Sequence, residues 1–123
     1  YLWSEVAGFS KFGSYVGNGS ADGVFVYCGF RPRVILMKAS NAAEQWSIWD
    51  SSRLGYNPYQ AFLAAQSSSA EDATVSGANS NGGPDFLSNG FKMRSTGGSS
   101  NNSSVTYIFA AFAESPFKYS LAR

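Results

Sequence analysis

The stretch VTYIFAAFA, residues 105–113, decides the fold class of this chain. Aromatic and β-branched residues fill it, and no glycine or proline interrupts it, so it favours extended backbone. Apolar side chains occupy both alternating faces of the extended segment, which is typical of a strand with neighbours on either side. The stretch therefore predicts the longest and most central strand of a β-sheet.

Shorter runs of the same kind precede it and are separated by turn residues. Arg33–Ala39 is also apolar on both faces, which predicts a strand sandwiched between two layers. Gln45–Asp50 alternates cleanly, so the two tryptophans Trp46 and Trp49 should point to opposite faces. Further strands are predicted at Lys11–Val16, Gly23–Cys28, Phe62–Ala64 and Ala73–Ser76, and a hairpin joins Asp85–Leu87 to Phe91–Arg94 through Ser88-Asn89-Gly90.

Helical periodicity is almost absent from the chain. Only Tyr59–Gln66 has helical propensity, and it predicts at most one or two turns. About eight or nine short strands without crossover helices imply antiparallel pairing. One sheet cannot bury the 16% of residues that are aromatic, so we expect an all-β, antiparallel β-sandwich of jelly-roll or lectin-like type. Residues 1–123 should form a single domain, a fragment or C-terminal module of a longer chain.

The charge pattern argues against several classes of partner. Nine Lys and Arg against eight Asp and Glu give a formal charge of +1, and the charges are scattered singly. Such a chain offers no positive field for nucleic acid, and no run approaches the roughly 20 apolar residues of a membrane span. We therefore expect no nucleic-acid partner and no membrane insertion. Charged residues make up only 14%, which hints at a surface covered by neighbours.

Residues for catalysis are also scarce. The chain has no histidine, which removes Ser-His-Asp and Cys-His arrangements and the commonest metal ligand. We expect no catalytic residue, no metal and no cofactor, although two distant carboxylates that converge in space, as in glycosidases, would reopen the question. The single cysteine, Cys28, lies in an apolar run and should be buried and inert.

Two local patterns suggest ligand contacts, each with a structural alternative. Asp50 and Arg53 can close a bidentate pair across a turn, either as a clamp on the loop or as a ligand contact. Tyr56, Asn57 and Tyr59 form a loop with two phenols and an amide, which suits a sugar unless both rings pack onto the edge of the sandwich. The polar loops Ser76–Pro84 and Gly97–Ser104 add the candidate ligand residues Asn79, Asn81, Asn101 and Asn102.

Several phrases in a fixed order carry a resemblance to a known group of proteins. They are GFSKFGSY (8–15), GNGSADG (17–23), FVY (25–27), GFRPR (29–33), WSIWDSSR (46–53), FLSNGFK (86–92) and YIFAAFAESPF (107–117). The set resembles a β-rich domain of virion proteins from tailed bacteriophages, found in tail fibres and tail-associated adhesins.

The resemblance implies a module on the surface or tail of the phage particle. Its expected function is receptor binding, through contact with a bacterial surface glycan or an outer-membrane protein. The alternative is a structural virion module, for decoration or fibre assembly, that contacts only other viral proteins. Either role fits a homo-oligomer, typically a trimer in fibres, and a rigid β frame with variable loops.

Overall fold

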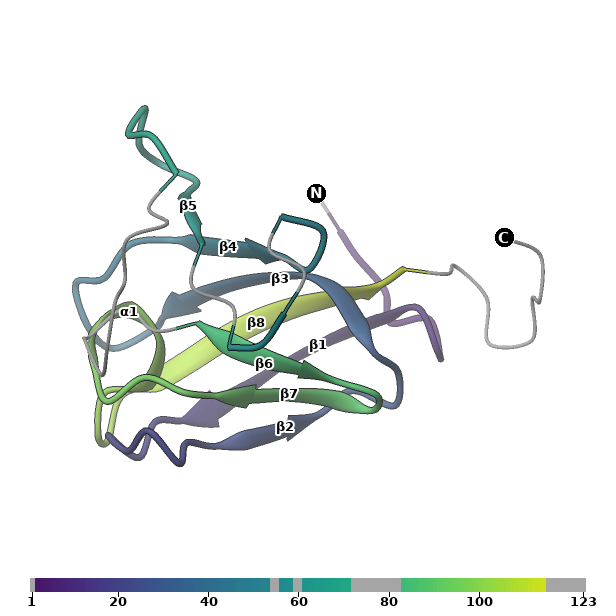
Figure 1. Ribbon diagram of the computed structural model, residues 1–123, viewed down its shortest axis with the longest axis horizontal. Coiled ribbons are helices and arrows are strands. Elements are labelled where there is room, and N and C mark those ends of the chain that lie inside the picture. The colour runs from purple at the N-terminus through teal and green to yellow at the C-terminus, as the bar shows by residue number, and fades with distance from the viewer. Residues whose placement is uncertain (1, 54–55, 59–60, 72–82, 115–123) are drawn as a thin grey trace.

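The computed structural model describes residues 2–53, 56–58, 61–71 and 83–114, and these form an all-β sandwich of two antiparallel sheets (Figure 1). Strands account for 43% of the structure and helix for 4%. The strands are β1 (Ser10–Val16), β2 (Phe25–Tyr27), β3 (Pro32–Ala39), β4 (Ser47–Asp50), β5 (Leu63–Ala64), β6 (Pro84–Leu87), β7 (Gly90–Met93) and β8 (Thr106–Ala113). The predicted fold class is confirmed.

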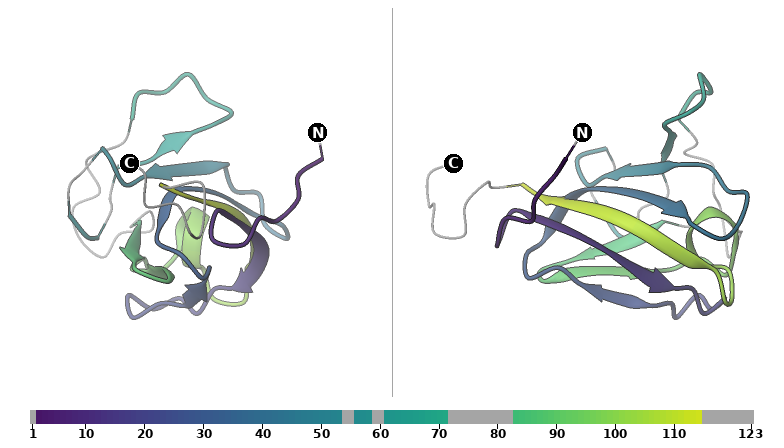
Figure 2. Two further views of the ribbon diagram at one scale, coloured as in Figure 1. Left: turned by 90° about the vertical axis from the view of Figure 1, so that its right-hand side faces the viewer. Right: turned by 180° about the vertical axis from the view of Figure 1, so that it is seen from behind.

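The larger sheet has the order β1-β8-β3-β4-β5, and the smaller has the order β2-β7-β6. The two sheets lie as separate layers in both views of Figure 2, and the segment around β5 projects from the sandwich. Strand β8 lies between β1 and β3, as the apolar stretch at 105–113 predicts. It shares its length of eight residues with β3, the other central strand.

The core lies between the two sheets and consists mainly of rings. Trp49 on β4 is fully buried while Trp46 reaches the opposite face, which confirms the predicted alternation. Phe91 of the small sheet meets Phe109 of the large sheet edge to face, with ring centroids 5.3 Å apart. The predicted hairpin is present, with Leu87 paired to Gly90 across a two-residue turn. Other fully buried core side chains are Ile35, Met37, Phe86, Met93 and Tyr107.

Two stacked tyrosines hold the segment before β8 against the sheet. Tyr15 and Tyr107 have ring centroids 5.3 Å apart, and the Tyr107 hydroxyl donates to the carbonyl oxygen of Gly98 at 2.9 Å. The Tyr15 hydroxyl donates to the carbonyl oxygen of Ser100, and burial raises the pKa of this phenol well above its ordinary value. The segment forms α1 (Gly98–Asn101), the one helix in the part of the chain described here.

Two local predictions are wrong. No helix forms over the described residues 61–66; the strand predicted at Phe62–Ala64 is present instead as β5, where Leu63–Ala64 pairs with β4 and Phe62 packs near Trp49. The predicted turn pair of Asp50 and Arg53 does not form, because other strands and loops bring better-placed partners. Asp50 lies 3.3 Å from Arg33 Nε, and Arg53 pairs with Glu71. The predicted strand at 73–76 lies outside the described residues.

Candidate binding groove on the outer face of the large sheet

The outer face of the five-stranded sheet carries a row of apolar side chains that the small sheet does not cover. The strand register aligns Phe12, Ala110, Leu36 and Ile48 across β1, β8, β3 and β4. Their neighbours one residue away in each strand point into the core. The apolar pattern of β3 predicted a covering layer on each face of its sheet, whereas in the described structure the small sheet covers one face.

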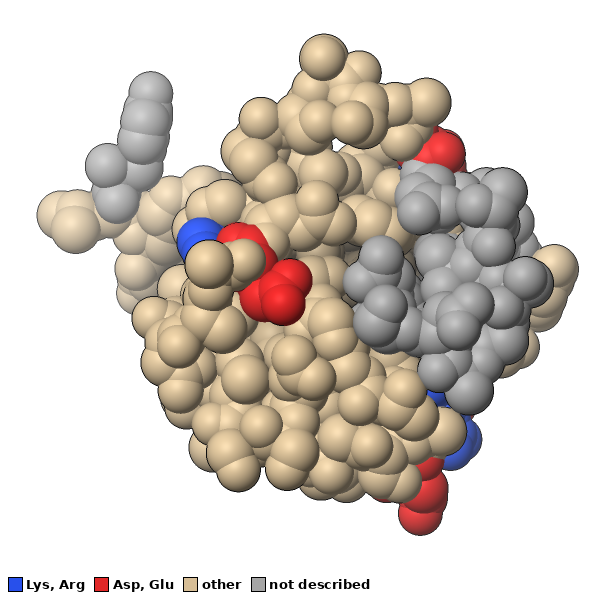
Figure 3. All heavy atoms as spheres, turned by 90° about the vertical axis from the view of Figure 1, so that its left-hand side faces the viewer, with Lys and Arg blue, Asp and Glu red and all other residues tan. Residues whose placement is uncertain are grey.

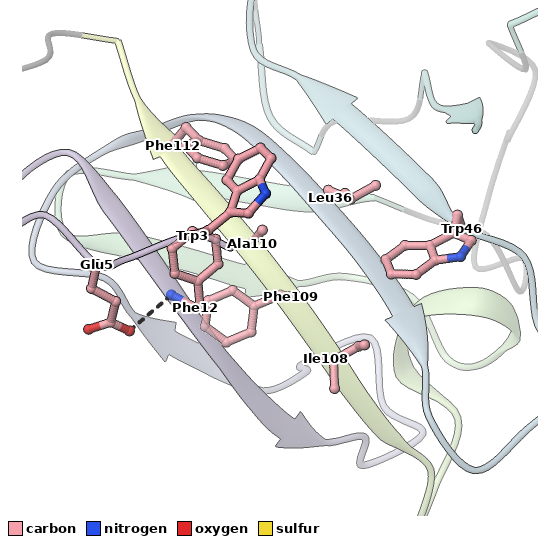
Figure 4. Close-up of a pocket in the computed structure, with 9 residues that line it drawn as sticks. All are labelled: Trp3, Glu5, Phe12, Leu36, Trp46, Ile108, Phe109, Ala110 and Phe112. Carbon is pink, nitrogen blue, oxygen red and sulfur yellow. Dashed lines mark hydrogen bonds between the residues drawn. The ribbon is translucent and has the colours of Figure 1, made fainter. Parts of the chain in front are cut away.

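Three residues of this row, Phe12, Ala110 and Leu36, line a groove with a volume of about 590 Å³, and Ala110 and Leu36 lie in its floor (Figure 4). Ala110 makes the floor low at its centre, because a methyl group stands there between larger side chains. Trp3 lies over β8 on one side and Trp46 lies at the start of β4 on the other. The lining residues are Trp3, Glu5, Phe12, Leu36, Trp46, Ile108, Phe109, Ala110 and Phe112.

Trp3 reaches the groove on an N-terminal arm, residues 2–9, that folds back over the sheet. Its ring centroid lies 6.0 Å from that of Phe12 and 5.3 Å from that of Phe112. Phe9 extends the cluster, with its ring centroid 6.2 Å from that of Phe112. The indole nevertheless keeps 65% of its surface exposed. The arm thus supplies a wall whose ring is supported from below and open to solvent.

A carboxylate fixes the arm to the edge of the sheet. Glu5 accepts hydrogen bonds from the backbone N–H of Phe12 and from Lys11 Nζ, each at 3.0 Å. These two bonds, the backbone bond first, lower the pKa of Glu5 below its ordinary value, so the group is ionised at neutral pH. Figure 4 draws the bond between Glu5 and Phe12. Glu5 is the one acidic residue among those that line the groove.

The groove is built for contact area and not for acid–base chemistry. Its walls are rings, its floor is aliphatic, and its single carboxylate is engaged with the backbone. Among the described residues, no group of three or more Asp, Glu, Cys or His side chains is arranged to hold a metal ion. Aromatic walls with few polar groups are typical of sites that bind small ligands or partner surfaces by stacking and burial.

Comparison with known proteins places the chain in a family. One family model, described as a domain of unknown function (DUF7483), matches residues 1–116. The chain belongs to the DUF7483 family. No curated protein and no solved structure matches it. The function of this DUF7483 domain must therefore be argued from its own geometry.

The loop predicted as a sugar platform lies apart from the groove. Tyr56 is 71% exposed but does not line the groove, and Tyr59 lies outside the described residues. The Asn57 side chain has a structural use: its amide nitrogen donates to the carbonyl of Phe86 at 3.1 Å, and its oxygen accepts from the N–H of Phe86 at 2.9 Å. Asn57 thus pairs with the free edge of β6 as another strand would.

Of the four loop asparagines, the structure describes Asn101 and Asn102, and these two differ in burial. Asn101 is fully buried and bonds to Asn18, Ser20 and Ser95, so we assign it a structural role in place of the predicted ligand contact. Asn102 is exposed, and its backbone N–H donates to the Tyr107 hydroxyl at 2.9 Å. Asn79 and Asn81 lie outside the described residues.

Sequence reasoning missed both indoles of the groove. Trp46 was placed correctly on a face, but the alternation within one strand does not show whether that face is covered. Trp3 precedes the first predicted strand, so nothing local indicated that it would fold back. A usable signal was present in β3 and β8 together: both are apolar on both faces, whereas the chain has too few strands for three layers.

Cys28 of the DUF7483 domain should react very slowly in the folded state. The thiol is buried with 7% exposure, and burial raises its pKa to about 12. At pH 8 only about one part in 10⁴ would be thiolate, the form that is alkylated. We expect iodoacetamide to modify the native protein about a hundredfold or more slowly than the urea-unfolded chain, as followed by mass spectrometry. Equal rates in the two states would show that the thiol is accessible.

Within the described residues, no helix has the length and apolar character needed to cross a membrane.

The described surface is poor in charge on the face drawn in Figure 3, where Lys, Arg, Asp and Glu occupy small patches among uncharged residues. Contacts made through the described part of that face must therefore depend mainly on uncharged groups.

Proposed function

We propose that this domain is a non-catalytic attachment module of a phage tail fibre or tail-associated protein, and that its groove binds a sugar ring of a bacterial surface glycan. The observation that carries the binding role is the pair of indoles, Trp3 and Trp46, flanking an uncovered apolar floor. The placement on the virion rests on the resemblance of the ordered sequence phrases to phage virion domains. The groove lies on a regular β-sheet, which can hold the stacking side chains in place without a conformational change on binding.

Sugar rings suit this lining for a physical reason. A pyranose presents a face of C–H groups that packs against an aromatic ring, and its edge presents hydroxyl groups to water or to polar side chains. Here the indoles supply the stacking surfaces, and the Glu5 carboxylate stands at the rim as a hydrogen-bond acceptor. Lys38 lies opposite Ile108 but does not line the groove, and its ammonium group donates to the carbonyls of Ala39 and Glu44.

Trp46→Ala should abolish most glycan binding without unfolding the domain. Trp46 is half-buried at the start of β4, and its side chain lines the groove without entering the core. Losing one of two stacking surfaces should weaken affinity by about tenfold or more. The measurement is binding of the immobilised domain to an array of bacterial lipopolysaccharide and teichoic-acid oligosaccharides, then calorimetry with each oligosaccharide that binds.

Tyr56→Ala is the matched control for that experiment. Tyr56 is an exposed ring that does not line the groove, so its removal should leave glycan affinity unchanged. The reverse pattern, in which Tyr56→Ala loses binding and Trp46→Ala retains it, would move the site to the 56–58 loop. Absence of any glycan binding by the wild-type domain at high density would contradict the proposal.

A second function, a structural virion module, is favoured by the apolar arm itself. Leu2 is fully exposed, Trp3 is 65% exposed and Val6 is 48% exposed, and exposed apolar groups in one segment often mark a protein contact. A structural module would bury this arm against another viral protein. Imaging of the intact particle separates the two functions, because an attachment module needs the arm and groove to face the exterior.

A further inference from the structure

Strand β1 is the outermost strand of the large sheet, and half of its backbone groups turn away from the protein. The bonds from the N–H of Gly17 to the carbonyl of Val105, and from the N–H of Ala113 to the carbonyl of Phe9, fix which residues face β8. In an antiparallel ladder these alternate, so the N–H and C=O groups of Phe12, Ser14 and Val16 face the open side.

The open side of β1 is only partly occupied. The N–H of Phe12 is bonded to Glu5, whereas no hydrogen-bond partner for the N–H groups of Ser14 and Val16 occurs among the described residues. The Val16 side chain is 56% exposed. No charged residue and no proline occurs from Phe12 to Gly17. Natural edge strands usually carry such residues to prevent pairing with other chains, and in β1 the one charged residue, Lys11, precedes this stretch and is paired with Glu5.

We propose that the open edge of β1 pairs antiparallel with β1 of a second copy of this chain, about a two-fold axis at Ser14. In that register the N–H and C=O of Ser14 bond reciprocally to those of Ser14 of the partner subunit. The N–H of Val16 donates to the carbonyl of Phe12 of the partner subunit, and the symmetry-related bond runs from Val16 of the partner subunit to the carbonyl of Phe12. The carbonyl of Val16 of the partner subunit also faces the Phe12 N–H, so in the dimer it takes the place of the Glu5 carboxylate at that N–H.

The side chains of the edge favour a second copy as the occupant. The two-fold register sets Phe12 opposite Val16 of the partner subunit on the outer face, an apolar pair at each end of the contact. The uncharged edge sets no like charges against each other. Pairing would join two five-stranded sheets into one and bring the two grooves onto a continuous face. This inference is independent of what the groove binds.

A contact of this kind closes with two copies, because the same surface is used on both. It therefore predicts a dimer, and a trimer of the type common in fibres would need another surface. The wild-type domain should sediment as a dimer that dissociates on dilution, measured by analytical ultracentrifugation from about 1 to 500 µM.

Val16→Lys should weaken that dimer by about tenfold or more in dissociation constant, because each lysine would set a charge in place of the apolar partner of Phe12 at both ends of the contact. Ala43→Lys is the control, since Ala43 is exposed in the β3–β4 connection, which β8 separates from the open edge of β1, and should leave the dimer intact. Circular dichroism should show both variants folded. A Val16→Lys variant that dimerises like the wild type would overturn the proposal.

Ser14→Pro provides a second test that does not depend on charge. The substitution removes an N–H that faces away from β8, and proline is tolerated at edge positions of this kind. Gly13 precedes it in extended strand conformation, so the ring meets no side chain there. The variant should be a folded monomer at concentrations where the wild type is a dimer. A wild-type protein that stays monomeric over the whole range would equally refute the edge pairing.

Discussion

Replacing Asn101 with alanine is expected to lower the free energy of unfolding by about 3 to 4 kcal/mol. Its amide nitrogen donates to the carbonyls of Ser20 at 2.9 Å and Ser95 at 2.8 Å and to the Asn18 side chain at 2.9 Å. Its oxygen accepts from the N–H of Asn18 at 3.1 Å. Alanine would leave the buried carbonyl of Ser95 without this donor, break the bonds to the less buried groups of Asn18 and Ser20, and leave a cavity in place of the buried amide.

The matched control is the adjacent residue. Asn102 is exposed, and its backbone makes its hydrogen bonds with the Tyr107 hydroxyl and the Val105 N–H, so Asn102→Ala should change stability by less than about 0.5 kcal/mol. Urea unfolding followed by tryptophan fluorescence measures both variants. Asn101→Asp is a useful third variant, because a carboxylate cannot donate to the carbonyls of Ser20 and Ser95 and should also destabilise. Equal stability of the Asn101→Ala and wild-type proteins would contradict the structural role.

Gly90→Ala is expected to destabilise the domain by about 3 kcal/mol, at the upper end for an overpacked site. Gly90 opens β7 and pairs with Tyr27 of β2. A Cβ atom at this position would lie 2.0 Å from the carbonyl oxygen of Val26 and 3.2 Å from the backbone nitrogen of Cys28. Backbone cannot yield as a flexible side chain does, so β2 would have to move away from β7.

Gly29→Ala separates this steric effect from ordinary backbone strain. Gly29 has a φ of 80°, which disfavours alanine, but its nearest neighbour for a Cβ is the Tyr27 hydroxyl at 3.5 Å. The expected loss is about 1 to 2 kcal/mol, the usual cost of a left-handed conformation for a residue with a side chain. Thermal unfolding ranks the two variants, and a Gly90→Ala loss no larger than that of Gly29→Ala would contradict the close approach of β2.

The strands could be predicted from sequence because each depends on a local pattern. Residues 105–113 specify a central strand wherever the neighbours come from, and the turn Ser88-Asn89-Gly90 specifies a hairpin within a few residues. The stretch Tyr59–Gln66 carried two predictions, a short helix and a strand at Phe62–Ala64. Its alanines favour helix only weakly, whereas pairing of Leu63–Ala64 with Ser47 and Ile48 favours the strand. Tertiary pairing overrides weak propensity in such short segments.

The site could be predicted much less well, because its residues depend on contacts far apart in sequence. Asn101 forms hydrogen bonds with Asn18, which is 83 residues away in the sequence. The low-complexity loop around Asn101 contains no pattern that distinguishes a buried structural asparagine from an exposed one that contacts a ligand. Asp50 forms its ion pair with Arg33 on the neighbouring strand and not with Arg53, which is three residues away in the sequence. Trp3 and Trp46 line the same groove only because the N-terminal arm folds over β1 and β8.

The indole N–H signals of the three tryptophans test the central claim most directly. Trp3 and Trp46 flank the groove, whereas Trp49 is fully buried in the core on the other side of the sheet. In a ¹H–¹⁵N spectrum recorded during titration with an oligosaccharide that binds on the array, the signals of Trp3 and Trp46 should shift and that of Trp49 should stay in place. Binding that leaves the signals of Trp3 and Trp46 unmoved would contradict the assignment of the groove as the binding site.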